Sequence, residues 1–180
     1  MTQIVETAKG NGKLIGHGLY YDQLTAGMHF YTMGRTITEA DLVAFINLCW
    51  LNEEGFVSVD PESPHTIQGR FIPGCMIYTI AEGLMVPSMQ FTGQAFLHTE
   101  LFHKAPVRVG DTIHVEVEIV ESRRTAKGNR GLVRASNKVL NQHGELVLHY
   151  TPLRMIKGSP IAEEEFTSPL GDPPALPGRQ

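Results

Sequence analysis

The chain contains 180 residues, of which 42% are hydrophobic and 19% charged, and its formal net charge is −4 at pH 7. This composition is typical of one soluble globular domain, and the slightly acidic balance argues against a nucleic acid partner. Cys49 and Cys75 lack the spacing of a zinc site, so we expect no metal and a reduced, cytoplasmic protein. No window reaches the roughly 18 apolar residues that a membrane span needs, so we expect no membrane association.

Two segments in the first half of the chain carry helical signals. Residues 1–19 are polar and glycine-containing, and we interpret them as a flexible lead-in. A first helix is predicted to begin after Thr38, an N-cap residue followed three positions later by Asp41, as in a capping box. A second and far more apolar helix is predicted to follow Gly74 and to end at Pro87.

The second half of the chain is dominated by strand signals. Apolar and polar residues alternate in Ile113–Ile119, and the pattern continues in Leu132–Leu140 and Leu146–Tyr150. Asn141–Gly144 has the composition of a hairpin turn between the last two segments. Residues 158–180 contain many prolines and several glutamates and are interpreted as an extended acidic tail. The sum of the elements predicts an α+β domain over residues 20–157.

Three stretches of this domain resemble MaoC-like dehydratases, the group that includes R-specific enoyl-CoA hydratases. The first is Gly34–Phe45, and the second is Gly69–Gly74, which precedes the apolar helix. The third comprises Pro106–Ile113 with Arg130–Val133 and Asn141–Glu145. The resemblance covers roughly residues 20–156. It implies a single hot-dog domain, in which an antiparallel sheet wraps around a central helix, and a homodimer or larger homo-oligomer with acyl-thioester sites at the subunit interface.

The chain departs from this family at the positions of its two catalytic side chains. Members of the family carry an Asp and a His shortly after the first helix, which together hold the reacting water. Ungapped alignment from Phe45 places Leu51 at the Asp and Phe56 at the His. Because neither side chain can transfer a proton, the usual mechanism cannot be carried over.

Nearby ionisable residues offer substitutes for the missing pair. Glu53 and Glu54 lie in the altered segment, and an apolar pocket formed with Trp50 and Phe56 would raise the pKa of a carboxylic acid there. The alternative is that both acids are solvated. His65 precedes the apolar helix and is a further acid or base candidate, or else an exposed loop histidine. His98 and His103 are candidates too, although the alternation around them favours ordinary strand positions.

Two residues near the apolar helix are candidates for substrate binding. Gly74 matches the family glycine whose backbone N–H contacts the thioester oxygen, although a glycine at this place also permits close packing. Arg70 is a candidate ligand for a phosphate or carboxylate, and otherwise an exposed arginine.

The sequence leaves three functions open. The first is an acyl-CoA hydratase or dehydratase, a lyase with a non-standard acid/base pair and with CoA only as part of its substrate, so that no separate cofactor is needed. The second is an acyl-CoA thioesterase, which can use the same oxyanion site. The third is a non-catalytic acyl-CoA-binding subunit of a hydratase complex.

Overall fold

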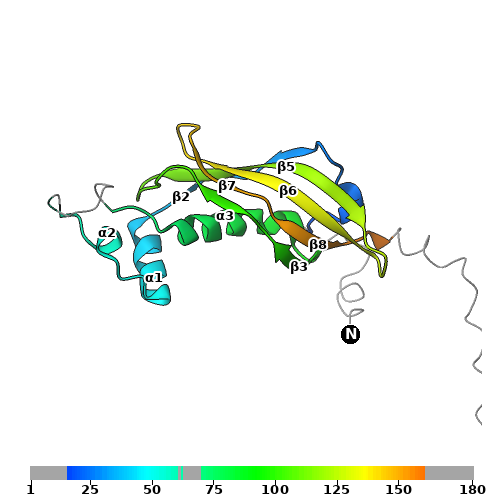
Figure 1. The fold of residues 1–180 in the computed structure, drawn as a ribbon, viewed down its shortest axis with the longest axis horizontal. Helices are drawn as coiled ribbons and strands as arrows, with labels where there is room; N and C mark the ends of the chain where they lie inside the picture. Colours follow the sequence, from blue (N-terminus) through cyan, green and yellow to red (C-terminus); the bar gives the residue numbers. More distant parts are fainter. Residues whose placement is uncertain (1–15, 61, 63–69, 161–180) are drawn as a thin grey trace, which may run out of the picture.

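The computed structural model describes residues 16–60, 62 and 70–160, which form a curved antiparallel sheet with a long helix on its concave face (Figure 1). The strands of this part of the chain are β1 (His29–Tyr31), β2 (Arg35–Thr36), β3 (Gly93–His98), β4 (Leu101–His103), β5 (Thr112–Arg124), β6 (Arg130–Leu140), β7 (Leu146–Tyr150) and β8 (Leu153–Lys157). Its helices are the 3₁₀ turn η1 (Tyr21–Gln23), α1 (Glu39–Cys49), α2 (Glu54–Val57) and α3 (Gly74–Met89). The predicted α+β class is confirmed.

The long hairpin of β5 and β6 is the centre of the sheet. β1 and β2 pair with the free side of β5. β7 and β8 follow one another along the other side of β6, and β4 and β3 pair with them in turn. All these pairs are antiparallel. The arrangement leaves β3 and β4 as the outermost strands on the side of the sheet opposite β1.

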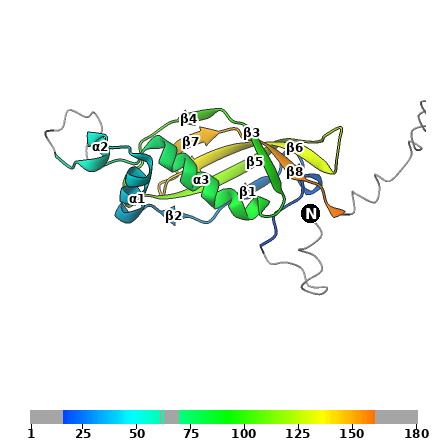
Figure 2. The same cartoon turned by 90° about the horizontal axis from the view of Figure 1, so that it is seen from below.

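The core lies between α3 and the concave face of the sheet (Figure 2). The predicted alternation is confirmed, because every second side chain along most of β5 and β6 is buried. α3 buries Met76, Ile77, Ala81 and Met85 against this face. Each large apolar side chain removed from water contributes about 2 kcal/mol, so these layers hold the fold together.

Two polar contacts supplement the apolar packing of α3. Arg154 of β8 donates two hydrogen bonds to the carboxylate of Glu82, at 2.6 and 2.7 Å. Tyr78 packs edge-on against Tyr150 of β7, with ring centroids 5.2 Å apart. Burial and the nearby Glu82 carboxylate raise the pKa of Tyr150, so its hydroxyl stays protonated. These contacts fix the middle of α3 over the strands β7 and β8.

The end of α3 differs from the prediction. Pro87 lies inside the helix, which continues to Met89. A proline in the final turn removes only one backbone N–H, the one that would bond to the Gly83 carbonyl, and the Ser88 hydroxyl donates to the Met85 carbonyl at 2.7 Å in the same turn. No helix in the described part of the chain is long and apolar enough to cross a membrane.

The folded part extends slightly beyond the predicted limits of residues 20–157. The Gly18 N–H donates to the carbonyl of Gln90, which directly follows α3. The Leu19 N–H donates to the carbonyl of Ser88, in the last turn of this helix. At the other end, Ser159 bonds to the Asp22 carboxylate. Most of the predicted lead-in and tail lies outside the described residues.

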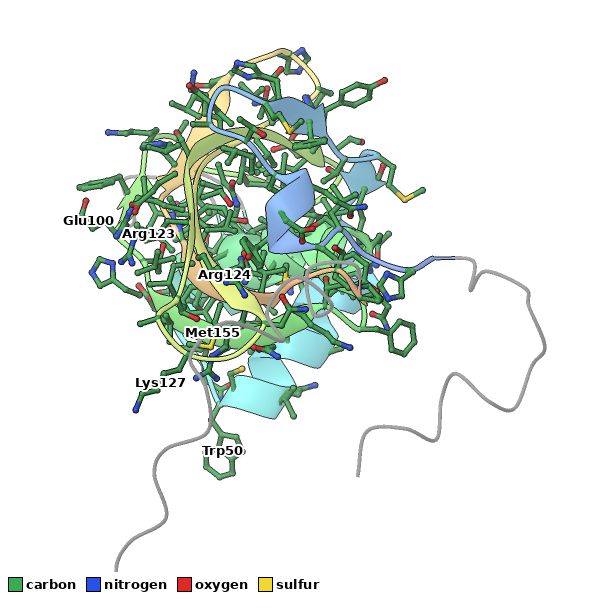
Figure 3. All side chains as sticks on the ribbon, turned by 90° about the vertical axis from the view of Figure 1, so that its right-hand side faces the viewer. Trp50, Glu100, Arg123, Arg124, Lys127 and Met155 are labelled. Atoms are coloured by element: carbon green, nitrogen blue, oxygen red, sulfur yellow. The ribbon has the colours of Figure 1, made fainter. Side chains whose placement is uncertain are left out.

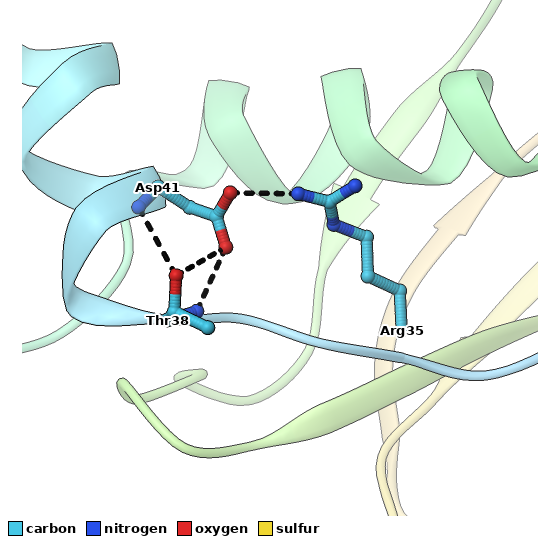
Figure 4. Close-up of polar contacts among 3 residues, drawn as sticks. All are labelled: Arg35, Thr38 and Asp41. Atoms are coloured by element: carbon cyan, nitrogen blue, oxygen red, sulfur yellow. Dashed lines mark hydrogen bonds and ion pairs between the residues drawn. The ribbon is translucent and has the colours of Figure 1, made fainter.

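The start of α1 confirms the predicted capping box (Figure 4). The Thr38 hydroxyl accepts from the Asp41 N–H at 3.3 Å, and one Asp41 oxygen accepts from the Thr38 N–H at 2.9 Å. Arg35 donates to the other oxygen at 2.6 Å. The Thr38 N–H and hydroxyl, assisted by Arg35, hold the pKa of Asp41 below its ordinary value. The box therefore joins β2 to α1.

We expect Asp41→Asn to lower the free energy of unfolding by about 1 kcal/mol at pH 7, because the variant loses the charge that the box stabilises. A carboxylate with a lowered folded-state pKa stabilises the fold above its unfolded pKa, near 4, and loses this effect as pH falls through the folded pKa. Urea denaturation between pH 7 and pH 3 should show the difference from wild type shrinking below about pH 4. Glu100→Gln, which alters an exposed carboxylate, is the control, and an undiminished difference at pH 3 would contradict the assignment.

Candidate active site at the start of the central helix

The first turn of α3 offers backbone donors. Its N-cap is Pro73, which has no side-chain acceptor for the N–H groups of the helix. Met76 and Ile77 donate to the Pro73 carbonyl, whereas the N–H groups of Gly74 and Cys75 have no acceptor within the helix. The positive end of the helix dipole lies at the same place. This turn can therefore stabilise negative charge on a ligand oxygen.

A histidine ring lies directly against this turn. A Cβ atom built on Gly74 would be 2.6 Å from Cε1 and 2.7 Å from Nε2 of His103. His103 is the last residue of β4, pairs with Leu148 of β7 and is exposed in the isolated chain. Only a glycine at position 74 leaves room for the imidazole in this position. The structure thus brings an acid/base side chain beside the backbone donors.

The alternation of the sequence around His103 favours an ordinary strand position, yet the structure makes this residue a candidate for function. It lies 29 positions from Gly74 in the chain, and β4 reaches the start of α3 only because β4 pairs with β7 at the edge of the sheet. The signal available in the sequence was the histidine itself, close to the predicted apolar helix. Strand alternation alone cannot identify what lies opposite a side chain.

Arg70 binds residues of the protein itself. Its Nε donates to the carbonyl of Phe56 at 2.9 Å, and its guanidinium also bonds to the Glu39 carboxylate. These contacts tie α2 to the start of α1. The Arg70 side chain is 18% exposed, so part of its charge is withdrawn from solvent. Its predicted role in binding substrate stays a prediction.

The two apolar replacements of the family pair belong to the core. Phe56 is 8% exposed and packs edge-on against Phe71, with ring centroids 5.0 Å apart. Leu51 is half-buried against the same core. Phe56 therefore has a packing role, whether or not it also contacts a substrate.

Glu53 and Glu54 lie at the start of α2, and both are exposed. The described residues form no enclosed apolar pocket around them, because Trp50 points away from the protein (Figure 3) and is 85% exposed. His65 lies outside the described residues. No group of three or more metal-binding side chains occurs within the described ranges.

Trp50 adopts a backbone conformation that favours glycine. It follows α1 directly, with a φ of 59° and its N–H bonded to the Ile46 carbonyl. Left-handed conformations at helix ends are usually occupied by glycine, because other residues have a strained Cβ. The resembled family carries glycine at the aligned position, so the backbone here follows the family pattern although the side chain does not.

We expect Trp50→Gly to raise the free energy of unfolding by about 1 kcal/mol, because glycine relieves the strain and the exposed indole contributes little packing. Guanidinium denaturation measures the effect. Trp50→Ala keeps the Cβ and is the matched control, for which no comparable gain is expected. A loss of stability in the glycine variant would show that the indole makes contacts in solution that the isolated chain lacks.

No family model and no curated protein matches this chain. Solved structures do resemble it. A monoamine oxidase regulatory protein from Archaeoglobus is 25% identical with a TM-score of 0.71, covering 80% of this chain and 97% of that one. A MaoC-like dehydratase from Rhodospirillum rubrum is 24% identical with a TM-score of 0.70, covering 79% and 99%. The R-hydratase PhaJ1 from Pseudomonas aeruginosa is 22% identical with a TM-score of 0.66, covering 79% and 88%. The resemblance predicted from the sequence is confirmed in three dimensions: the chain has the hot-dog fold of MaoC-like dehydratases and R-hydratases.

Proposed function

We propose that this protein binds an acyl-CoA thioester at the start of α3 and acts on it as a hydratase or dehydratase. The observation that carries the proposal is the His103 imidazole lying against Gly74, beside N–H groups that have no acceptor within the helix. CoA enters only as part of the substrate in this scheme. The fold shared with a MaoC-like dehydratase and an R-hydratase supports the choice of reaction.

The proposed chemistry assigns one task to each group. The thioester oxygen accepts from the Gly74 N–H, which stabilises the negative charge of an enolate. His103 removes a proton from water while the water oxygen bonds to the β-carbon, and the electron pair of the double bond moves onto the thioester oxygen. The protonated imidazole then returns its proton to the α-carbon. Dehydration is the reverse sequence.

Glu53, Glu54 and His65 remain proposed as the second acid/base group. Glu53 precedes α2 and Glu54 begins it, and Arg70 ties this helix to the first helix through the Phe56 carbonyl. Closure of this end of the domain by a second subunit would bring these exposed carboxylates into a drier environment.

We also propose that two copies of the chain associate. β3 is exposed along its whole length, and Phe96, Leu97 and Phe102 on β3 and β4 are each nearly half exposed. Exposed strands with large apolar side chains at the edge of a sheet favour pairing with another chain. An interface there would cover the strand that carries His103.

A second candidate is a non-catalytic acyl-CoA-binding subunit. The observation that favours it is the burial of Phe56 against Phe71 at the position of the family histidine, with Leu51 in place of the aspartate. These packed apolar residues would preserve the fold while a partner chain supplied the acid/base pair.

We expect the purified protein to hydrate crotonyl-CoA, measured as loss of the enoyl-thioester absorbance, and His103→Gln to lower kcat about 100-fold. The matched control is His98→Gln, five residues earlier in the chain, which should leave kcat nearly unchanged. The double variant Glu53→Gln, Glu54→Gln tests the carboxylates separately. A loss of activity in this variant would assign the second acid/base group to α2.

The remaining outcomes separate the alternatives. Release of free CoA without loss of the double bond would identify a thioesterase. Tight binding of acyl-CoA without either reaction would identify the binding subunit. Equal activity of wild type and His103→Gln would contradict the role of His103.

A further inference from the structure

A cavity lies at the other end of α3. It has a volume of about 460 Å³ and lies between the last turns of α3, the strand β1 and the concave face of β5 and β6. Figure 2 shows this half of the helix crossing the sheet. Phe30, Val117, Met85 and Met89 are among the apolar side chains that line it. The cavity is large enough for a small organic molecule.

Two small residues create the space. Gly83 faces the cavity from α3, and a Cβ added to it would meet no atom within 4 Å. Ala135 faces it from β6, where larger side chains would fill the space. A glycine in the middle of a helix costs about 1 kcal/mol relative to alanine. Packing against a neighbouring atom does not explain Gly83, because nothing lies close enough to exclude a methyl group.

The floor of the cavity contains buried polar atoms without partners. Asn137 lines the cavity, is 1% exposed, and neither its Oδ1 nor its Nδ2 has a hydrogen-bond partner among the described residues. Tyr150 pairs with Asn137 in the sheet but does not line the cavity, and its buried hydroxyl interacts with the Asn137 and Glu82 side chains. An unsatisfied buried donor or acceptor costs about 1–3 kcal/mol, so a ligand group that bonds to the Asn137 amide would stabilise the protein.

The charges around the cavity select a neutral ligand. Arg154 is the cationic side chain among the residues that line the cavity, and it donates two hydrogen bonds to the Glu82 carboxylate. Its charge is therefore compensated within the protein. A ligand carboxylate placed here would be desolvated without a free cation to pair with it.

The cavity is separate from the site proposed at the start of α3. Gly83 lies nine residues after Gly74, which corresponds to about 13 Å along a helix. Neither His103 nor Gly74 lines the cavity.

We propose that this cavity is a second ligand site, which binds a neutral molecule with a hydrocarbon body and one hydroxyl group. The hydroxyl donates to Asn137 Oδ1 or accepts from Asn137 Nδ2. The apolar walls enclose the hydrocarbon. Asn137 is then a specificity-determining residue that lowers the stability of the empty protein.

The test compares two volatile probes of the same shape, 1-octanol and nonane, in which a methyl group replaces the hydroxyl. Headspace gas chromatography over the full-length protein measures the affinity of each. We expect Asn137→Leu to lower the ratio of octanol to nonane affinity about ten-fold. The two probes differ in hydrophobicity, but this difference is the same for wild type and for Asn137→Leu. The change in the affinity ratio between the two proteins therefore reports the polar contact alone.

Two further variants check the location. Gly83→Leu fills the open space beside α3 and should abolish binding of both probes. Lys138→Leu is the matched control for Asn137→Leu, because it changes the next residue of β6 on the opposite, exposed face, and it should leave the ratio unchanged. In spectra of ¹³C-methyl-labelled methionine, octanol should shift Met33, Met85 and Met89, which line the cavity, more than Met155, which does not.

Stability distinguishes a ligand site from a structural role of Asn137. We expect the ligand-free Asn137→Leu variant to melt about 3 °C above wild type, because it removes unpaired polar atoms. A lower Tm with an unchanged probe ratio would show that Asn137 supports the core, and would overturn the proposal. Failure of either probe to bind wild type, or shifts at methionines remote from the cavity, would overturn it as well. Acyl-CoA turnover is measured separately and has no bearing on these outcomes.

Discussion

The burial of α3 in the concave face of the sheet is the constraint on which the rest of this structure depends. An apolar helix cannot remain in water, and the inward side chains of β5 and β6 form the surface that covers it. Curvature of the sheet around the helix then determines where its edges lie. The bidentate contact between Arg154 and Glu82 fixes the middle of the helix against β8. A helix held in this way has defined ends, and the two candidate sites lie beside different parts of it.

The two halves of α3 differ in what they present to a ligand. The first turn offers unpaired N–H groups with a histidine beside them, which suits a developing negative charge. The second half offers an apolar space lined by the buried Asn137 amide, which suits a neutral molecule. In both places a glycine creates the opening: Gly74 admits the His103 ring, and Gly83 leaves the cavity open. Function on this fold is thus set by the residues at each opening.

The segment after α1 contributes apolar side chains to the core. Phe56 packs against Phe71, and Leu51 contacts the same cluster. Arg70 bonds to the Phe56 carbonyl and to Glu39, which joins α2 to the first helix. The backbone nevertheless keeps a left-handed residue at Trp50, where the resembled family has glycine. The backbone geometry of this segment therefore follows the resembled family although its side chains differ, and His103 lies against the start of α3.

The sequence by itself determined the elements whose causes are local. The capping box of Thr38 and Asp41 is formed by residues three positions apart, and strand alternation follows from the two faces of a sheet, so both were predictable. Even the hot-dog fold could be predicted, because its motifs lie in order along the chain. Only the tertiary structure placed His103 against Gly74 and Asn137 beside Tyr150, since each of these contacts joins separate elements. The tertiary structure also leaves the Trp50 side chain exposed and lets α3 continue beyond Pro87. The physical reason is that neighbours along the chain set conformation, whereas the environment of a side chain depends on which strands and helices pack against it.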